Sequence, residues 1–191
     1  MASHNDIMKL VAALRRGDPE AHKALFALVY QELKVMAHRQ LLCLGSAQTI
    51  NTTALVHEAY LKVIDRRDLI SWQGKAHIQA VAAKAMRQII VDYARKKQAS
   101  KRGGQASHTR FTSSAHPAQS YLEEMLDLDK ALTEMAVQQP RGSRVVELRY
   151  FGGLSVEETA EVLGVSARTV RRDWSEARAF LYLSLQEAEG A

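Results

Sequence analysis

Apolar residues recur at intervals of three and four along most of the chain, which is the spacing of one face of an α-helix. Four such segments precede residue 98, and they span residues 5–16, 19–44, 52–66 and 75–97. The residues expected to face inward are Ile7, Leu10, Val11 and Leu14 in the first segment, Leu25, Leu28, Val29, Leu33 and Met36 in the second, Val56, Ala59, Tyr60, Val63 and Ile64 in the third, and Ile78, Ala82, Ala85, Ile89 and Tyr93 in the fourth. Runs of β-branched residues are short, so the pattern predicts an all-α protein.

Residues with known capping preferences stand at the ends of these segments. Gly17 is expected to stop the first helix, and Asp18 followed by Pro19 is typical of the start of the next, with Asp as N-cap and Pro in the first turn. Gly45 is expected to end that second helix. The outer side of the segment 75–97 is expected to expose Lys84, Arg87 and Arg95.

The composition changes at residue 98. Residues 98–122 are rich in Ser, Gly, Ala and Thr and contain few large apolar residues, which is typical of a flexible linker. Helical patterning returns near Tyr121 and continues to about residue 187. The sequence therefore predicts two small helical domains, residues 1–97 and 123–187, joined by a linker over residues 98–122.

The stretch LSVEETAEVLGVSARTVRRDWSEARAFLYL contains the strongest local pattern of the second domain. Ser155 and Glu158 have the spacing of a capping box, Gly164 allows a tight turn, and Ser166 is placed to cap a second helix. The expected inward residues are Val156, Ala160, Leu163 and Val165, followed by Val170, Trp174, Ala177 and Leu181. A short helix, a glycine turn and a longer capped helix together predict a helix-turn-helix.

Polar and basic residues gather near the start of that second helix, where a helix-turn-helix meets the major groove of DNA. They are Ser166, Arg168, Thr169, Arg171, Arg172 and Ser175. Arginine suits guanine or phosphate, and serine and threonine accept several partners. Which arginines contact bases and which contact phosphates stays open, and the alternative is a helical hairpin with a solvated arginine face.

The overall charge agrees with a polyanionic partner. The formal net charge is +5 and the pI is 9.4. Basic residues form two separate clusters, which are Arg95, Lys96, Lys97, Lys101 and Arg102, and Arg168, Arg171, Arg172 and Arg178. The net charge does not identify the partner, and the two separate basic clusters are more informative than the total.

Several classes of protein are disfavoured by the sequence. No apolar stretch approaches the ~20 residues that span a bilayer, and MASHNDIMKL has neither the basic nor the apolar region of a secretion signal. The single cysteine, Cys43, lies among apolar residues as a structural thiol would. We therefore expect a cytoplasmic protein that does not contact a membrane.

Enzymatic motifs are also missing. His57 and Glu58 begin a zinc-protease pattern, but position 61 is leucine and no second histidine follows one turn later. The sequence contains no glycine-rich phosphate loop, no cysteine pair and no nucleophile elbow, and its histidines lack the spacing of metal ligands. We expect no catalytic activity, no metal site and no cofactor.

Four stretches resemble the sigma-70 family of bacterial transcription initiation factors, specifically the extracytoplasmic-function (ECF) type. RGDPEAHKALFALVYQELK is similar to the opening helix pair of that group, and LVHEAYLKV is similar to its Leu-Val-Gln-Glu-x-Phe-Leu core. SWQGKAHIQAVAAKAMRQIIVDYARKK occupies the place of the promoter-melting segment, and the helix-turn-helix matches the domain that reads the −35 element. The resemblance covers nearly the whole chain except the linker.

The resemblance implies that the first domain docks on the β′ coiled coil of core RNA polymerase and opens the −10 element, while the second reads the −35 element of promoter DNA. The residues that match the polymerase contact are Asn51, Thr53, His57 and Glu58. The candidate −10 contacts are Trp72, Lys84, Arg87, Arg95, Lys96 and Lys97. A basic helix can follow a phosphate backbone, and Trp72 is either a base-stacking residue or a core plug.

One motif departs from the family. Typical members carry an Asp-x-Glu-Asp segment before the core motif, but here Asn51, Thr53 and Ala54 occupy the three acidic positions. Phosphorylation of Thr52 or Thr53 by a Ser/Thr kinase would restore about −1.5 to −2 charges at the same place. The hypothesis is a phospho-activated sigma factor from a kinase-regulated subgroup. The alternative is that Asn51, Thr52 or Thr53 is only an N-cap.

A second interpretation assigns the chain to a different class of protein. A stand-alone helix-turn-helix transcriptional regulator would use the same C-terminal motif, but it would need a sensor or dimerisation domain, and the first 97 residues show helical periodicity throughout. Such a regulator would bind its operator without polymerase. The sequence leaves open whether an anti-sigma protein also controls the chain, and whether the two domains pack together.

Overall fold

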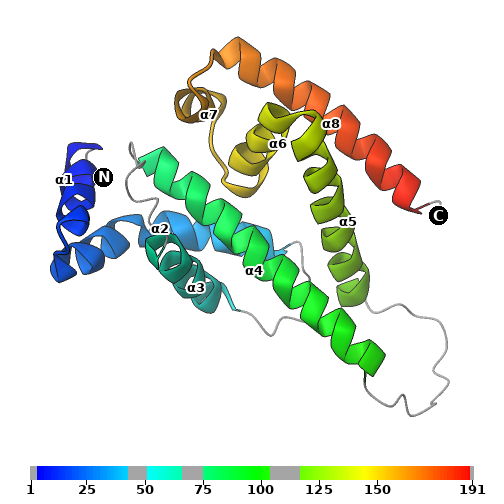
Figure 1. The fold of residues 1–191 in the computed structure, drawn as a ribbon, viewed down its shortest axis with the longest axis horizontal. Helices are drawn as coiled ribbons and strands as arrows, with labels where there is room; N and C mark the ends of the chain where they lie inside the picture. Colours follow the sequence, from blue (N-terminus) through cyan, green and yellow to red (C-terminus); the bar gives the residue numbers. More distant parts are fainter. Residues whose placement is uncertain (1–3, 43–50, 66–74, 104–116, 190–191) are drawn as a thin grey trace.

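The structure, a computed structural model, describes residues 4–42, 51–65, 75–103 and 117–189. Every element within these ranges is a helix, which confirms the all-α prediction (Figure 1). The predictions for Cys43, Gly45 and Trp72 lie outside the described residues.

The first half of the chain contains four helices: α1 (His4–Arg15), α2 (Pro19–Leu42), α3 (Thr52–Asp65) and α4 (Lys75–Gly103). The predicted cap between α1 and α2 is present, because the Glu20 amide donates to Asp18 Oδ1 at 3.0 Å and Gly17 has a φ of +81°. Most predicted inward residues are buried, while Leu10, Leu28, Tyr60 and Tyr93 are partly exposed. Helix α2 lies against α1, α3 and α4 and forms the centre of this half.

The second half contains α5 (Pro117–Gln138), α6 (Pro140–Val146), a single π-helical turn η2 (Glu147–Phe151), α7 (Val156–Leu163) and α8 (Ala167–Glu189). The turn η2 continues α6, and its wider winding is shown by the hydrogen bond from the Gly152 amide to the Glu147 carbonyl at 2.9 Å. Helix α8 packs across α5, α6 and α7.

The ends of the predicted linker differ from the expectation. Helix α4 continues to Gly103, six residues beyond the end expected from its apolar spacing, and α5 already begins at Pro117. Residues 98–102 of the first extension include Gln, Ala, Lys and Arg, which have good helix propensity, and Pro117 suits the first turn of α5. Residues 104–116 lie outside the described ranges.

The two halves pack against each other. Helix α4 contacts α5, η2 and α7, and Figure 1 shows α5 beside α4. One buried apolar cluster contains Met86 and Ile90 of α4 together with Met135 of α5 and Phe151 of η2. The side-chain amide of Gln40 on α2 donates to the Phe151 carbonyl at 3.1 Å. The apolar core therefore crosses the predicted domain boundary, and the division into two domains stays a prediction.

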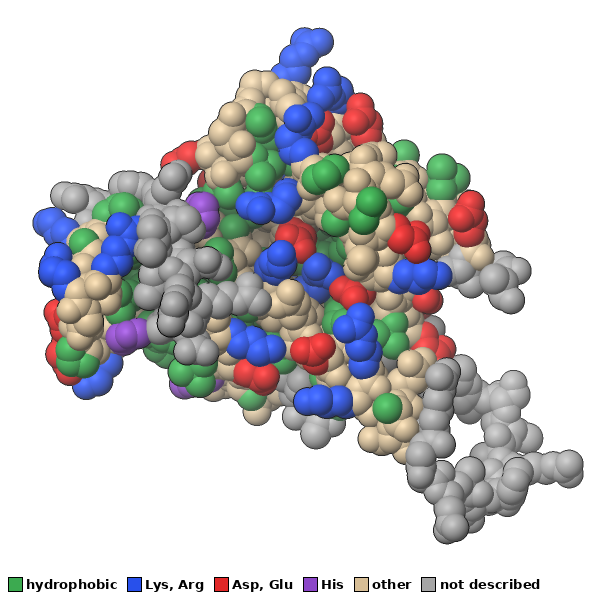
Figure 2. Space-filling view, viewed as in Figure 1, with side chains coloured by type: hydrophobic (Ala, Val, Ile, Leu, Met, Phe, Trp, Pro, Cys, Tyr) green, Lys and Arg blue, Asp and Glu red, His purple; other side chains and the backbone are tan. Residues whose placement is uncertain are grey.

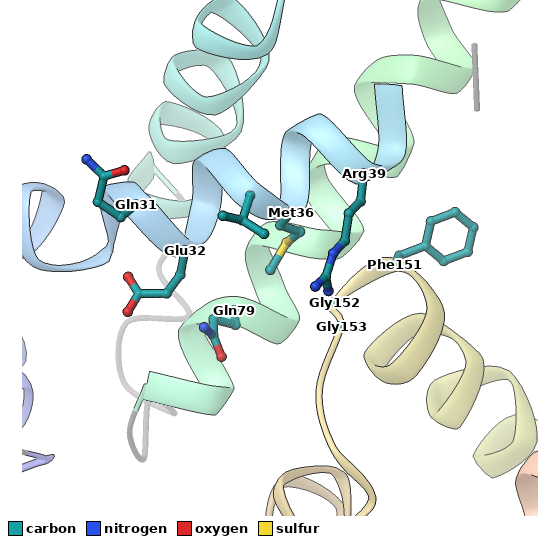
Figure 3. A pocket seen from close by; sticks show the side chains of 9 residues that line it. Gln31, Glu32, Met36, Arg39, Gln79, Phe151, Gly152 and Gly153 are labelled. Carbon is teal, nitrogen blue, oxygen red and sulfur yellow. The ribbon is translucent and has the colours of Figure 1, made fainter. Parts of the chain in front are cut away.

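A cleft of about 280 Å³ lies where α2, α4 and the end of η2 meet (Figure 3). Arg39 extends from α2 toward Gly152 and Gly153, while Phe151 points away from it. A Cβ atom added at Gly153, which has a φ of +69°, would lie 2.6 Å from Arg39 Nη1. The glycine therefore allows the close approach of the two halves at this point.

Two kinds of feature are absent from the described residues. No helix among them is both long enough and apolar enough to cross a membrane. The same residues contain no group of three or more His, Cys, Asp or Glu side chains arranged to hold a metal ion.

Candidate nucleic-acid interface

The predicted helix-turn-helix is formed by α7, α8 and the turn between them. Ser155 Oγ accepts from the Glu158 amide at 3.1 Å and Glu158 Oε2 accepts from the Ser155 amide at 2.8 Å, so the capping box is present. Gly164 ends α7 with a φ of +64°, and Ser166 Oγ accepts from the Thr169 amide at 3.1 Å. The local predictions for this motif are confirmed.

A small apolar cluster sets the position of α8 on α7. Val145 of α6, Ala160 of α7 and Val170 of α8 form it, and Trp174 packs against it. The guanidinium of Arg149 lies 4.6 Å from the centre of the Trp174 ring, in a cation–π arrangement. These contacts hold the first two turns of α8 with one side toward solvent.

The solvent side of α8 carries the predicted −35 contacts. Ser166, Arg168, Arg171, Arg172 and Ser175 are exposed, and Thr169 is half-buried. Arg171 pairs with Glu157 of α7 at 3.3 Å, so this arginine has an exposed acidic neighbour. The six residues share one end of one helix, which is the geometry that a reading helix needs.

Next to this surface, a buried carboxylate pairs with exposed arginines, which the sequence pattern did not predict. Asp173 is 4% exposed and accepts hydrogen bonds from the guanidinium of Arg141 on α6 and, at 3.2 Å, from Arg172. The hydrogen bond from Arg141 lowers the pKa of Asp173 below its usual value, despite burial, and the hydrogen bond from Arg172 adds to the effect. Asp173 follows the inward Val170 by three residues, and a carboxylate on an inner face indicates that a cation pairs with it.

The predicted −10 contacts on α4 are only partly exposed. Lys84, Arg95 and Lys96 face solvent, and Lys97 lies over the Tyr93 ring with Nζ 5.8 Å from its centre. The expectation that Arg87 is exposed was wrong, since 9% of this residue is accessible. Helix α5 and η2 cover it, and carboxylates from both balance its charge.

The predicted polymerase contacts lie together along one side of α3. Asn51, Thr53, His57 and Glu58 are exposed, and Leu61 one turn further on is 68% exposed. Behind this surface the rings of Phe26 and His57 meet edge to face at 5.2 Å. The four residues thus lie on an exposed side of α3, and their contact with polymerase stays a prediction.

The half-buried Tyr60 holds α3 on α2. Its hydroxyl donates to the His22 carbonyl at 2.7 Å, and burial raises the pKa of Tyr60 to about 12. The hydroxyl therefore stays protonated and keeps its role as a donor. This contact, with the Phe26 ring 4.5 Å from the Tyr60 ring, sets how the exposed side of α3 is presented.

The comparison with known families concerns both halves of the chain. A family model described as ECF sigma factor matches residues 4–187, which includes the helices of both halves. No curated protein matches the chain significantly. Sigma factors of this type bind core RNA polymerase and promoter DNA and direct transcription initiation. With a capped helix-turn-helix at one end, a basic helix at its centre and a match over nearly its whole length, the chain belongs to the ECF sigma factor family.

Proposed function

We propose that this ECF sigma factor binds core RNA polymerase through the exposed side of α3, and that phosphorylation of Thr52 or Thr53 strengthens that binding. The main observation behind the proposal is that Asn51, and neither threonine, caps the N-terminus of α3. The Asn51 side chain accepts from the Ala54 amide at 2.8 Å, and the Asn51 carbonyl accepts from the Leu55 amide at 3.0 Å. Neither threonine hydroxyl is therefore needed to begin the helix.

The electrostatics of the first turn favour an added anion. Helix α3 has no acidic residue in its first turn, although its amide dipoles place positive potential there. Thr52 and Thr53 occupy the first two helical positions, whose amides point toward the N-terminus. A phosphate at either residue would interact with this end of the helix and supply the charge that the family's acidic segment provides.

Accessibility favours Thr53 over its neighbour. Thr53 is exposed, whereas Thr52 is half-buried, and the resemblance to the family's acidic segment places Thr53 on an acidic position. In the proposed reaction the threonine oxygen bonds to the γ-phosphorus of ATP on a Ser/Thr kinase. ADP leaves, and the hydroxyl proton passes to a base of the kinase. The product carries its charge beside Glu58 and His57, the other exposed polar residues of α3.

The DNA contacts complete the proposed function. We assign Lys84, Arg95, Lys96 and Lys97 of α4, together with Arg87 and Trp72, to the −10 element. The exposed residues of α8 are assigned to the −35 element, because arginines at the start of a capped reading helix suit a major groove. Trp72 lies outside the described residues, so its assignment depends on the sequence alone.

The experiment that tests the switch is a measurement of affinity for purified core RNA polymerase. We expect weak binding by the wild type, and binding about tenfold tighter or more in Thr53→Glu or Thr52→Glu, since one ion pair at an interface is worth about 1.4 kcal/mol or more. Thr53→Gln and Thr52→Gln are the matched controls, because they change shape in the same way without charge. Tight wild-type binding, or equal effects of Glu and Gln, would contradict the proposal.

The stand-alone regulator is the alternative that a second measurement separates. A sigma factor is expected to bind a promoter fragment specifically only after it has joined core polymerase, whereas a regulator would bind its operator alone. Gel-shift titrations with and without core polymerase distinguish the two. The family match over residues 4–187 favours the sigma factor, because it includes the first half that a regulator would use differently.

A further inference from the structure

The carboxylate of Asp129 on α5 holds two arginines of α4. Arg87 Nη1 donates to Asp129 Oδ1, and Arg95 Nη2 donates to Asp129 Oδ2 at 2.9 Å. The Asp129 side chain is 16% exposed, so it lies largely within the contact between the two helices. Arg87 and Arg95 stand eight residues apart on α4, and their guanidinium groups converge on this one anion.

A second carboxylate completes the arrangement. Glu147 Oε1 of η2 accepts from Arg87 Nη2 at 2.8 Å, and 11% of each side chain is exposed. We refer to Arg87, Arg95, Asp129 and Glu147 as the Asp129 cluster. Both acids belong to the second half of the chain and both arginines to α4. The cluster therefore joins the basic helix to the part that carries the helix-turn-helix.

The two helices are complementary along more of their length. Residues 75–103 of α4 contain eight basic residues and one acidic residue, whereas residues 117–138 of α5 contain five acidic residues and one basic residue. Figure 2 shows acidic and basic side chains alternating over the region where these helices meet. The acidic helix α5 therefore places negative charges against the basic helix α4, as a DNA backbone would.

We propose that Arg87 and Arg95 form a phosphate-binding site for promoter DNA, and that the Asp129 carboxylate occupies this site in the free chain. Carboxylate and phosphate are recognised by arginine through the same paired hydrogen bonds. Promoter DNA and α5 therefore compete for α4. The proposal rests on the assignment of α4 to DNA under Proposed function, and it adds that the chain masks this surface itself.

A purely stabilising role for the cluster is the competing explanation. Buried ion pairs are often no more stabilising than apolar residues of similar volume, so stability alone gives little reason for two acids and two arginines here. The exposure of Arg95, at 61% of its side chain, also leaves one member accessible to an incoming phosphate. A competing anion can bind there before α5 separates.

The first experiment measures binding of the free protein to a fluorescein-labelled single-stranded oligonucleotide at several salt concentrations. Asp129→Asn is expected to bind about tenfold tighter than the wild type, which corresponds to one additional charged hydrogen bond. The slope of log K against log salt should become steeper by about 0.7 for each additional phosphate that the arginines bind. Asp127→Asn is the matched control, because Asp127 is an exposed acid of α5 that makes no ion pair with a described residue of α4. Equal affinity and slope for Asp129→Asn and Asp127→Asn would overturn the proposal.

A second experiment uses the wild-type chain, so its result does not depend on whether a variant folds. Hydrogen exchange of the α5 amides should become faster when saturating oligonucleotide is added to the wild type, because DNA displaces α5 from α4. Unchanged exchange at saturation would overturn the proposal.

Promoter binding by holoenzyme tests the assignment of α4 to DNA separately from the proposal that Asp129 masks α4. If Arg95→Gln weakens promoter binding by holoenzyme while Asp129→Asn leaves the free protein unchanged, α4 contacts DNA but is not masked. If Arg95→Gln has no effect in holoenzyme, the assignment of Arg95 to DNA fails as well.

Discussion

Arg87 on α4 and Glu147 on η2 form an ion pair of 2.8 Å, although sixty residues separate them in the sequence and only 11% of each side chain is exposed. The same guanidinium group also holds Asp129 of α5, and it lies 5.7 Å from the centre of the Phe151 ring. One side chain of the first half is thus surrounded by three residues of the second. Arg87 is therefore one of the residues through which the two halves contact each other.

Arg87→Met should destabilise the folded chain. The substitution keeps most of the volume but leaves Glu147 in the contact without its guanidinium partner, which costs about 3–5 kcal/mol for a buried pair. Urea denaturation measures the free energy of unfolding. Lys84→Met, an exposed change on the same helix, should alter it by less than about 0.5 kcal/mol. A similar loss in both variants would show that the ion pair is not the cause.

The stability of the helix-turn-helix should depend on pH through Asp173. Hydrogen bonding to Arg141 lowers the pKa of this carboxyl in the folded state below its ordinary value of 3.8. Its contribution is therefore fully present above pH 3.8 and is lost as the pH falls through the folded pKa. The difference in unfolding free energy between wild type and Asp173→Asn should shrink on acidification. Glu176→Gln, at an exposed acid on the same helix, is the comparison variant, and a constant difference for Asp173→Asn would contradict the prediction.

We expect a second pH dependence of stability, caused by His77 at the contact between the halves. Burial, and then the charge of Arg144 on α6, lower the pKa of His77 below 6.5. The unfolded chain therefore takes up a proton at a higher pH than the folded chain. The contribution of His77 is present above pH 6.5 and is lost as the pH falls through the lowered folded pKa.

His77→Gln should flatten the fall in unfolding free energy below pH 6.5, which denaturation at a series of pH values measures. His38→Gln provides the comparison, because His38 is exposed on α2. If the two variants show the same pH profile, His77 is not the titrating group.

Two glycines with positive φ should respond differently to alanine. Gly164 has nothing within 4 Å of an added Cβ, so Gly164→Ala should cost only the backbone strain of a left-handed residue, about 1–2 kcal/mol. Gly153→Ala carries the same strain and must also displace the end of the flexible Arg39 side chain, so it should cost slightly more. Thermal unfolding of the two variants gives the comparison. An equal loss in the two variants would mean that Arg39 moves aside freely, and the double variant with Arg39→Ala should then recover no stability relative to Gly153→Ala alone.

Local structure was readable from the sequence wherever it depended on neighbours a few residues apart. The apolar spacing located the helices, Ser155 and Glu158 located a cap, and Gly164 located a turn, because these interactions join residues three to five positions apart. The same pattern could not choose among three candidates for the cap of α3. The backbone geometry at Asn51 made that choice, since its side chain reaches the Ala54 amide.

Partners far apart along the chain were decided only by the tertiary structure. The sequence showed Arg87 as one more cation on the polar side of a helix, and nothing near it indicated that Asp129 and Glu147 would cover it. Asp173 likewise meets an arginine thirty-two residues away. The sequence by itself determined where most of the helices lie and which helix exposes basic residues at its capped start, through short-range hydrogen bonds and apolar spacing. Which charges are buried, and how the two halves meet, followed from the packing of apolar surfaces that brings distant residues together.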